Sequence, residues 1–324
     1  MPINNTIIIG SGIAGLSCGI GLAARNIDAT ILDKGRNIGG RMATRVTSAG
    51  FEFDHGVQYI KAKDEHFQRV IQEARRELVL SQWEDGSVDQ RFVGTPRMNS
   101  FPAKLGEGLN IRQAVNVERI NRDKEFWSIY TDVDVLRARN VVVTIPAPQI
   151  PSLIGLDHPL SERLSLVEMS PCITLMAAFR GVYRCDLHNI SKTAGNLAWI
   201  ANNSSKPGRT GADCWVAQAA APWSEDRIDA PTEEIEKSLL SMLGEEIGVR
   251  PEEAIYSEVH RWKYANVTMP LGESCLKDST NSLFLGGDWC LGAKVEAAWK
   301  SGEALAHEII KKQGPAQCLA RDGV

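Results

Sequence analysis

A short glycine-rich segment near the start of the chain has the residue types and spacing needed to bind a diphosphate. The motif Gly10-x-Gly12-x-x-Gly15 follows a β-branched run at 6–9 and precedes a segment in which apolar residues recur with helical period. Gly10 permits a tight turn, Gly12 has no side chain to obstruct a diphosphate, and Gly15 allows close packing of helix and strand. The N–H groups at the start of the following helix also attract phosphate.

A carboxylate follows at the distance expected for ribose recognition. The helical pattern ends at Arg25, and a second apolar run, residues 29–32, ends at Asp33. Strand, helix and strand in succession predict a β-α-β unit, in which Asp33 accepts hydrogen bonds from ribose hydroxyls. The sequence therefore predicts dinucleotide binding.

Two further glycine pairs indicate a ligand longer than one nucleotide. Gly39-Gly40-Arg41 comes too soon for a new strand and helix, so we expect a loop near the same nucleotide, with Arg41 on the diphosphate. A surface turn with a solvated arginine is the alternative. Gly286-Gly287-Asp288 follows an apolar strand and precedes a helix from Val295, which offers a second helix N-terminus to a polar region such as the pyrimidine edge of a flavin. Together these segments favour FAD over NAD.

The order of these motifs carries a family resemblance. The segments 53–59 (FDHGVQY), 144–149 (TIPAPQ), 260–265 (HRWKYA) and 286–299 (GGDWCLGAKVEAAW) accompany the glycine motifs. The chain resembles the FAD-dependent amine oxidase superfamily and, within it, the renalase family, particularly its bacterial members. The resemblance runs from about residue 5 to residue 310.

The resemblance implies a discontinuous α/β Rossmann-like FAD-binding domain with an inserted α+β substrate domain built on an antiparallel sheet. The FAD-binding domain is expected at 1–60, 107–150 and 265–314, and the substrate domain at 61–106 and 151–264. Residues 315–324 are expected to be a disordered tail.

The resemblance also assigns residues to FAD. It implies that one group binds the diphosphate and ribose, a second lines the path to the flavin and a third binds adenine, the ribityl region and the pyrimidine edge. In chain order, these residues are Gly10, Ser11, Gly12, Ile13, Ala14, Gly15, Asp33, Lys34, Gly40, Arg41, Met42, Gly56, Val57, Gln58, Tyr59, Val117, Gly287, Asp288, Val295, Glu296 and Ala297. FAD is expected to be non-covalent, because Cys290 follows Asp-Trp and no cysteine has the Ser-Gly-Gly-Cys-Tyr context.

Catalytic residues are less clearly indicated, and the candidates are Gln58, His260, Trp262 and Tyr264. The last three alternate, so they share one face of a strand, where an aromatic ring could stack on a planar substrate. A structural role in the core or at a domain junction is the alternative for each. His55 occupies a position where the family resemblance leads us to expect an apolar residue, and both a role near the flavin and a buried, hydrogen-bonded histidine stay open.

A loop of the inserted domain, 202–211 (NNSSKPGRTG), contains two clustered cations. Lys206 and Arg209 are predicted to meet the phosphates of a dinucleotide substrate from a flexible cover; the alternative is a solvated loop.

Composition excludes several classes of protein. The 324 residues carry a net charge of −4 without a basic run, so we expect no nucleic-acid partner. The 7 cysteines are scattered without a Cys-x-x-Cys pair, which indicates reduced thiols in a cytoplasmic protein and no metal site. No apolar run is long enough to span a membrane, and the amino-terminal segment lacks the basic region of a signal peptide. The oligomeric state is left open.

The coarse pattern predicts further elements. We expect a hairpin at 115–131, strands at 140–144, 172–181, 212–220 and 282–288, and helices at 232–247 and 295–312.

Three functions follow from the resemblance. The first is an oxidase that takes hydride from the misreduced 2- and 6-dihydro isomers of NAD(P)H onto flavin N5, with molecular oxygen as acceptor and hydrogen peroxide as product. The second is an amine oxidase or a carotenoid-type desaturase, and the third is a flavin-binding protein without turnover. The first is favoured because a dihydropyridine becomes aromatic without giving a proton to a base, and no clear base is nominated.

Overall fold

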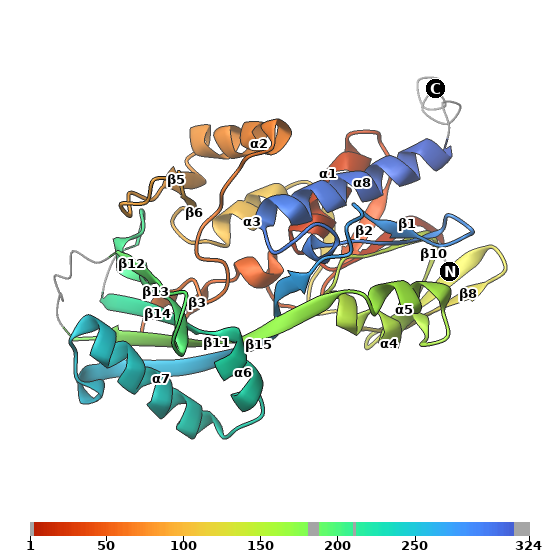
Figure 1. Cartoon of the computed structure of the whole chain (residues 1–324). Coiled ribbons are helices and arrows are strands. Elements are labelled where there is room, and N and C mark those ends of the chain that lie inside the picture. Colours follow the sequence, from red (N-terminus) through yellow and green to blue (C-terminus); the bar gives the residue numbers. More distant parts are fainter. Residues whose placement is uncertain (1–2, 181–187, 210–211, 314–324) are drawn as a thin grey trace. The chain divides into compact units, whose positions relative to one another are not determined.

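The computed structural model describes residues 3–180, 188–209 and 212–313, and these form two compact units (Figure 1). The first, the parallel-sheet unit, contains the described residues of 1–40, 102–169 and 267–324. The second, the antiparallel-sheet unit, contains those of 41–101 and 170–266. Two of the crossings between the units fall inside long strands, β11 (Glu168–Phe179) and β15 (Ala254–Met269). The predicted disordered tail, 315–324, lies outside the described residues.

The parallel-sheet unit is built on an eight-stranded sheet with the order β16-β17-β10-β1-β2-β7, to which the β8–β9 hairpin is joined through β10. Neighbouring strands from β17 to β7 pair in parallel, and β16 pairs antiparallel with β17. Its strands are β1 (Ile3–Ile9), β2 (Ala29–Leu32), β7 (Asn110–Arg112), β8 (Val117–Asp123), β9 (Phe126–Thr131), β10 (Val135–Val143), β16 (Leu276–Lys277) and β17 (Leu283–Leu285).

Both faces of this sheet are covered, which explains the continuous apolar runs of its central strands. On one face, Ile8 and Val142 pack in a core with residues of α1 (Ile13–Ala23) and α8 (Val295–Gln313). On the other face, Ile7, Ile9 and their neighbours pack with residues of α4 (Pro151–Ile154), α5 (Pro159–Leu164) and the β8–β9 hairpin. Three short 3-10 turns, η1 (Gly40–Met42), η2 (Ala147–Gln149) and η5 (Asp288–Cys290), and the helix α3 (Ser100–Leu105) complete the elements at or near this unit.

Helices α1 and α8 lie side by side because small residues line their contact (Figure 1). A Cβ atom added at Gly302 would lie 2.3 Å from the carbonyl oxygen of Ala14, and one added at Gly21 would lie 2.7 Å from the Cβ atom of Ala306. The first and last helices of the parallel-sheet unit therefore pack almost backbone to backbone.

The antiparallel-sheet unit is built on a five-stranded sheet with the order β12-β13-β14-β11-β15. Alternate residues of β11 and β14 face two different cores. Leu175 and Trp215 pack with the helix α7 (Thr232–Ile247), and Met176 and Val216 pack on the opposite face with Phe53. The other elements of the unit are β3 (Arg45–Val46), β4 (Glu52–Phe53), α2 (Glu65–Arg76), β5 (Leu80–Gln82), β6 (Phe92–Gly94), β12 (Asn189–Ser191), β13 (Leu197–Asn202), η3 (Asn203–Ser205), β14 (Asp213–Ala219), α6 (Ala221–Arg227) and η4 (Pro251–Glu253).

The predicted β-α-β unit, the hairpin and the two helices at 232–247 and 295–312 are confirmed. All four unit boundaries differ from the predicted domain boundaries, by a few residues at 102–106 and 265–266 and by more in two places. Residues 151–169 belong to the parallel-sheet unit, because Leu153, Leu160 and Leu164 are part of its core. Residues 41–60 belong to the antiparallel-sheet unit, where Asp54 and Phe53 are buried.

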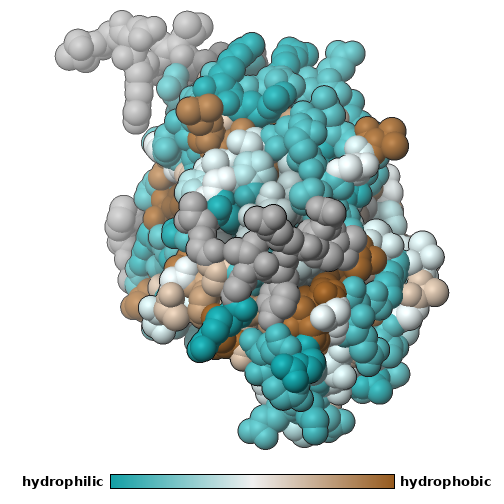
Figure 2. Space-filling model, turned by 90° about the vertical axis from the view of Figure 1, so that its left-hand side faces the viewer, coloured by the Kyte–Doolittle hydropathy of each residue, from teal (hydrophilic) through white to brown (hydrophobic). Residues whose placement is uncertain are grey.

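The face of the molecule drawn in Figure 2 is mostly hydrophilic, and hydrophobic side chains occur on it in small groups. In the part of the chain that the structure describes, no helix has both the length and the apolar character required to cross a membrane.

Candidate functional site

The carboxyl ends of four parallel strands meet at one edge of the parallel sheet. Ile9 at the end of β1 lies beside Leu32 of β2 and Val143 of β10, and Val143 lies beside Leu285 of β17. The residues that follow these strands therefore share this edge: Gly10, Asp33, Thr144 and Gly286. The chain leaves β1 toward β2, while β10 lies on the other side of β1, and open α/β sheets bind ligands at such a switch point.

The glycine motif forms the loop between β1 and α1, and its three glycines have different roles. Gly10 has a φ of +108°, which a side chain would make unfavourable. A Cβ atom at Gly15 would lie 1.9 Å from the carbonyl oxygen of Gly10, so the helix can approach the strand only with glycine there. A Cβ atom at Gly12 would meet no protein atom within 4 Å. The side of the loop at Gly12 is therefore open to a ligand, beside the start of α1, which no side chain caps.

The carboxylate of Asp33 is fixed next to this loop. Its Oδ2 accepts hydrogen bonds from the backbone N–H and the hydroxyl of Ser11 at 2.6 and 2.7 Å, and its Oδ1 accepts one from the N–H of Gly35 at 2.6 Å. A carboxylate has about four lone-pair sites, so it can accept from a ribose hydroxyl as well. Val115 donates its N–H to the carbonyl of Asp33 at 2.9 Å, which brings the start of β8 at Val117, the residue predicted to contact adenine, close to the same place.

The second glycine pair does lie against the first loop. The N–H of Gly39 donates to the carbonyl of Ser11 at 3.0 Å, and a Cβ atom at Gly40 would lie 3.6 Å from the Cα atom of Gly12. Lys34, in the segment between, is exposed. The geometry favours the predicted loop at the nucleotide over a free surface turn.

The third glycine pair follows β17 and is tied to α8. Gly287 donates its N–H to the hydroxyl of Ser301 at 2.9 Å, and Asp288 is buried with 6% of its surface exposed. Helix α8 begins at Val295, which is half-buried, as is Glu296; Ala297 is buried.

In the antiparallel-sheet unit, the backbone of Arg41 lies against the backbone of residues 56–57. Val57 donates its N–H to the carbonyl of Arg41 at 2.9 Å, and a Cβ atom at Gly56 would lie 2.0 Å from the same oxygen. The guanidinium of Arg41 donates to the carbonyl of Ala265 at 2.8 Å. Met42, which was predicted to line the cofactor path, is buried with 2% of its surface exposed.

Three rings form a cluster on this segment. The ring centroids of His260 and Trp262, both on β15, are 4.3 Å apart, and those of His55 and Trp262 are 5.3 Å apart in a stacked arrangement. The indole N–H of Trp262 donates to the carbonyl of His55 at 2.9 Å. The predicted face of β15 therefore contacts the segment predicted to adjoin the flavin. Tyr264, two residues further along, is half-buried.

The surroundings of both histidines of this cluster favour the neutral imidazole, because the pKa of each is lowered. Burial lowers the pKa of His55 to about 4, and the neighbouring His260 lowers it further. Burial also lowers the pKa of His260, and the positive charge of Arg45 adds to this. The open question at His55 is answered in part: the residue is 5% exposed and its Nδ1 lies 3.4 Å from the carbonyl oxygen of Phe53.

Tyr59 lies beside a cation and a second aromatic ring. The guanidinium carbon of Arg91 lies 4.3 Å from the ring centroid of Tyr59 and 5.1 Å from that of Trp199. Arg91 forms an ion pair with the buried carboxylate of Asp85. These contacts restrain the Tyr59 ring at the end of the segment 54–59.

The prediction that Lys206 and Arg209 form a flexible cover for substrate phosphates is wrong, and so is the alternative that they lie on a solvated loop. Their side chains are 0% and 3% exposed, and both form ion pairs with Asp54, which is itself fully buried. A buried carboxylate is unfavourable unless it is paired, and two cations satisfy it here. Burial would raise the pKa of Asp54, but Lys206, Arg209 and the hydroxyl of Thr44 lower it to about 2. Sequence reasoning missed Asp54 because its partners lie about 150 residues away and no local motif marks the pairing.

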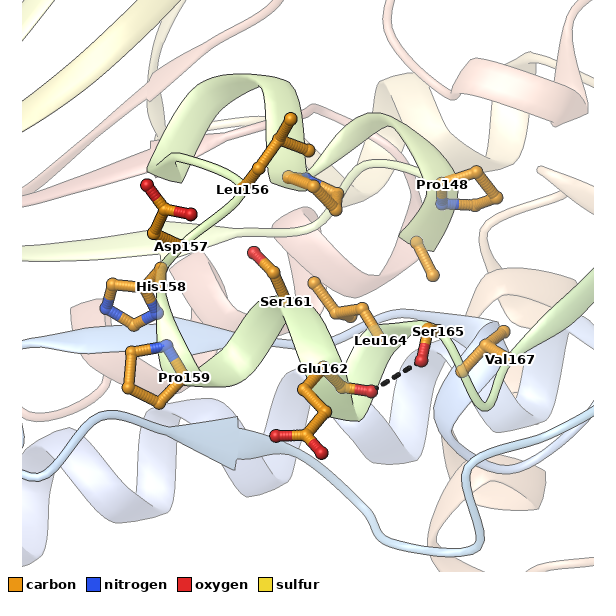
Figure 3. A pocket seen from close by; sticks show the side chains of 12 residues that line it. Pro148, Leu156, Asp157, His158, Pro159, Ser161, Glu162, Leu164, Ser165 and Val167 are labelled. Carbon is orange, nitrogen blue, oxygen red and sulfur yellow. Dashed lines mark hydrogen bonds between the residues drawn. The ribbon is translucent and has the colours of Figure 1, made fainter.

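Reactive residue types also line a surface depression of about 550 Å³ in the parallel-sheet unit (Figure 3). Asp157, His158 and Ser161 lie there, but the hydroxyl of Ser161 donates to the carbonyl of Gly155 at 2.8 Å. Nδ1 of His158 accepts the N–H of Leu160 at 3.2 Å and so caps α5. These polar atoms stabilise the turn and do not form a nucleophile and its base.

Two family descriptions match the chain. Residues 8–74 match the NAD(P)-binding Rossmann-like domain, and residues 89–310 match the flavin containing amine oxidoreductase. The second match covers more than half of the chain, and the chain therefore belongs to the flavin containing amine oxidoreductase family. It is a flavin-dependent oxidoreductase, and its cofactor is FAD.

Solved structures share the fold over almost the whole chain. A candidate protoporphyrinogen oxidase from Exiguobacterium sp. 255-15 has a TM-score of 0.77 at 14% identity and covers 97% of this chain and 100% of its own. Cyclohexylamine oxidase from Brevibacterium oxydans IH-35A has a TM-score of 0.76 at 13% identity, covering 96% and 100%. A putrescine oxidase has a TM-score of 0.71 at 12% identity, covering 96% and 100%. At these identities the likeness establishes a common fold.

The residues of the parallel-sheet unit fit the diphosphate and ribose of FAD. The space beside Gly12 is one that a Cβ atom would fill, the first turn of α1 presents N–H groups there, and Asp33 lies next to the loop with acceptor capacity left.

Proposed function

We propose that the chain is a renalase-like oxidase with non-covalent FAD, which takes hydride from the 2- and 6-dihydro isomers of NAD(P)H. Bound FAD supplies the two-electron acceptor for this chemistry. The substrate loses a hydride and becomes NAD(P)⁺, and molecular oxygen takes up the two electrons with two protons to give hydrogen peroxide. The protons are the one carried by the hydride and one from water.

The proposed roles in cofactor binding follow the geometry described above. Gly12 and the first turn of α1 would hold the diphosphate, Asp33 would hold the ribose, and Asp288 with the start of α8 would hold the ribityl and pyrimidine region. Burial raises the pKa of the Cys290 thiol to about 12, so this thiol is protonated, which supports non-covalent binding.

The observation that carries the proposal is the contact between the aromatic cluster and the segment 55–57. Trp262 packs within 3.4 Å of the Cβ position of Gly56 and donates a hydrogen bond to His55. An indole and a neutral imidazole at this place offer flat surfaces to a planar ring such as a dihydropyridine. We assign Trp262 and His260 to substrate positioning.

The electrostatics of the cluster support a substrate that needs no base. Burial lowers the pKa of His55 to about 4, which makes it a weak proton acceptor, and burial also lowers the pKa of His260. Arg45, which also lowers the pKa of His260, is paired with Glu258 at 3.3 Å, and Glu258 acts on this pKa in the opposite direction. A neutral dihydropyridine suits these imidazoles.

An amine oxidase or a carotenoid-type desaturase is the second candidate, and the family assignment supports the amine oxidase. Two of the proteins with this fold are named for oxidation of cyclohexylamine and putrescine. A flavin-binding protein without turnover is the third possibility.

Anaerobic mixing separates the three. The purified FAD-bound protein is mixed with one of five donors while flavin absorbance is followed: 2-dihydro-NAD(P), 6-dihydro-NAD(P), ordinary NADH (the 4-dihydro form), cyclohexylamine or putrescine. We expect the 2- and 6-dihydro isomers to bleach the flavin rapidly and ordinary NADH to bleach it slowly, since a misplaced reacting carbon costs a large factor in rate. On admission of oxygen, colour should return with one hydrogen peroxide per NAD(P)⁺. Bleaching by the amines alone replaces the proposal with the second candidate, and bleaching by none of them favours the third.

A further inference from the structure

The proposed function gives no role to the buried cations Lys206 and Arg209. Lys206 nevertheless contacts two side chains of the segment 54–59. The ammonium of Lys206 lies 3.2 Å from Oδ2 of Asp54 and 3.2 Å from Oε1 of Gln58. The loop that carries Lys206 is anchored by Asn203, which donates to the carbonyl of Glu52 at 3.0 Å and accepts the N–H of Asp54 at 3.3 Å. Lys206 joins this loop to the side chain of Gln58 as well.

An ammonium group only donates hydrogen bonds, so it determines the orientation of the amide that it contacts. With Oε1 of Gln58 facing Lys206, the amide nitrogen must point the other way. It donates to the carbonyl of Asp54 at 2.6 Å and to that of Gly56 at 3.1 Å. Gln58 is 6% exposed, so water has little access to substitute for these bonds.

The amide of Gln58 in turn helps to fix the peptide between Gly56 and Val57. The carbonyl of Gly56 also accepts from Nε2 of Gln218 at 2.7 Å, and the N–H of Val57 donates to the carbonyl of Arg41. Both polar groups of this peptide are therefore held from inside the antiparallel-sheet unit.

We propose that Lys206 is a positioning residue, whose ammonium sets the orientation of the Gln58 amide and through it the backbone conformation of residues 54–59. The role in turnover rests on the proposed function, which places this segment and its aromatic neighbours at the reacting groups. The role in backbone conformation rests on the contacts alone.

The cluster of Asp54, Lys206 and Arg209 can lose one cation without leaving a buried charge unpaired. Asp54 has two cationic partners, so replacing either one with methionine leaves one buried ion pair and removes an excess positive charge. K206M removes the contact with Gln58. R209M makes the same change of charge but leaves that contact intact, because the other bonds of Arg209 go to the carbonyls of Gly94 and Pro207. R209M is therefore the matched control.

The test is amide hydrogen exchange of the FAD-bound protein without substrate, read by mass spectrometry on peptides that span 54–59 and, for comparison, α7. K206M should speed exchange of 54–59 about tenfold or more, as expected for loss of one charge-assisted hydrogen bond, and leave α7 unchanged. R209M should change 54–59 less than threefold. Q58M should match K206M, and the K206M/Q58M double variant should exceed the larger single effect by less than twofold, because both act through one amide.

Several outcomes overturn the proposal: wild-type exchange of 54–59 in K206M, an equal effect in R209M, or single effects that multiply in the double variant. If K206M does not fold, the exchange measurement on Q58M tests the proposal instead, since this variant keeps the charges of the cluster. Unchanged exchange of 54–59 in Q58M then overturns the proposal.

With any donor that bleaches the flavin, K206M should lower the maximal bleaching rate at least tenfold and change the half-saturating donor concentration less than threefold. Failure of the dihydronicotinamides to bleach the wild-type protein removes the proposed function and leaves the exchange result standing.

Discussion

Adding one methyl group at Gly12 or at Gly15 should have opposite consequences, and the structure gives the reason. At Gly12 the new Cβ atom meets no protein atom within 4 Å, whereas at Gly15 it lies 1.9 Å from the carbonyl oxygen of Gly10. Gly12 has a φ of −71° and a ψ of 177°, which alanine adopts without strain. Gly12→Ala should therefore leave the fold intact and obstruct the diphosphate, while Gly15→Ala should strain the fold.

The magnitudes follow from these distances. At Gly15 the oxygen must move by about 1 Å to reach even a tight contact of 3.0 Å. Overpacking of this kind costs about 1–3 kcal/mol, and a rigid backbone on both sides favours the upper end. The better helix propensity of alanine returns up to about 1 kcal/mol, so a net loss of about 2 kcal/mol is expected. Gly12→Ala should change stability by less than about 0.5 kcal/mol, because the added Cβ atom meets no protein atom within 4 Å. It should weaken FAD binding at least about tenfold, or roughly 1.4 kcal/mol.

Two measurements on the apoprotein check this pair. Urea unfolding followed by tryptophan fluorescence gives the change in stability, and titration with FAD followed by quenching of flavin fluorescence gives the affinity. Wild-type affinity in Gly12→Ala would falsify the placement of the diphosphate beside this residue. Wild-type stability in Gly15→Ala would show that the contact between α1 and β1 is looser than the structure indicates.

Further predictions concern both units. Asp54→Asn leaves two buried cations without a carboxylate and should cost about 3–5 kcal/mol in urea unfolding; a loss below 1 kcal/mol would contradict the burial of the cluster. Because the folded-state pKa of Asp54 is lowered to about 2, its charge stabilises the fold above pH 4, and stability should fall more steeply between pH 4 and pH 2 in the wild type than in Asp54→Asn, where carboxylates such as Asp85 and Asp278 still contribute. Gly302→Ala places a methyl group 2.3 Å from the carbonyl of Ala14 and should destabilise the protein by about 1–3 kcal/mol, which thermal unfolding would detect. Trp262→Phe keeps a ring but loses the hydrogen bond to His55, and it should slow flavin bleaching about tenfold in stopped-flow measurements; an unchanged rate would exclude positioning by this indole.

The loop at Gly10–Gly15 and the position of Asp33 beside it were predictable because their signals are local. Glycine spacing, the strand before it and the helix after it identify the loop at Gly10–Gly15, and Asp33 follows from the end of the next strand. The carboxyl ends of parallel strands share an edge, so the distant Gly286–Asp288 could be assigned to the same edge. The aromatic face of β15 followed from strict alternation of side chains.

The interior of the antiparallel-sheet unit was not predictable in the same way. Lys206 and Arg209 stand in a stretch rich in serine, glycine and proline, which is typical of an exposed loop, and nothing near them in the sequence indicates burial. Their position depends on one carboxylate far away in the chain, and such pairing requires the tertiary fold. The unit boundaries at residues 41 and 170 depend in the same way on the core in which an apolar segment is buried. The periodicity of apolar residues does not predict which core that is.

The close packing of α1 against α8 has a consequence for the order of events during synthesis. The glycine loop and Asp33 leave the ribosome first, but β17 and α8, which complete the sheet and cover α1, follow more than 240 residues later. A nascent chain must keep Leu16, Leu22 and their neighbours in an unfinished core while the antiparallel-sheet segments emerge. Completion of the sheet edge therefore requires β17 and α8, and nascent chains stalled before residue 283 should expose an incomplete edge to chaperones and proteases.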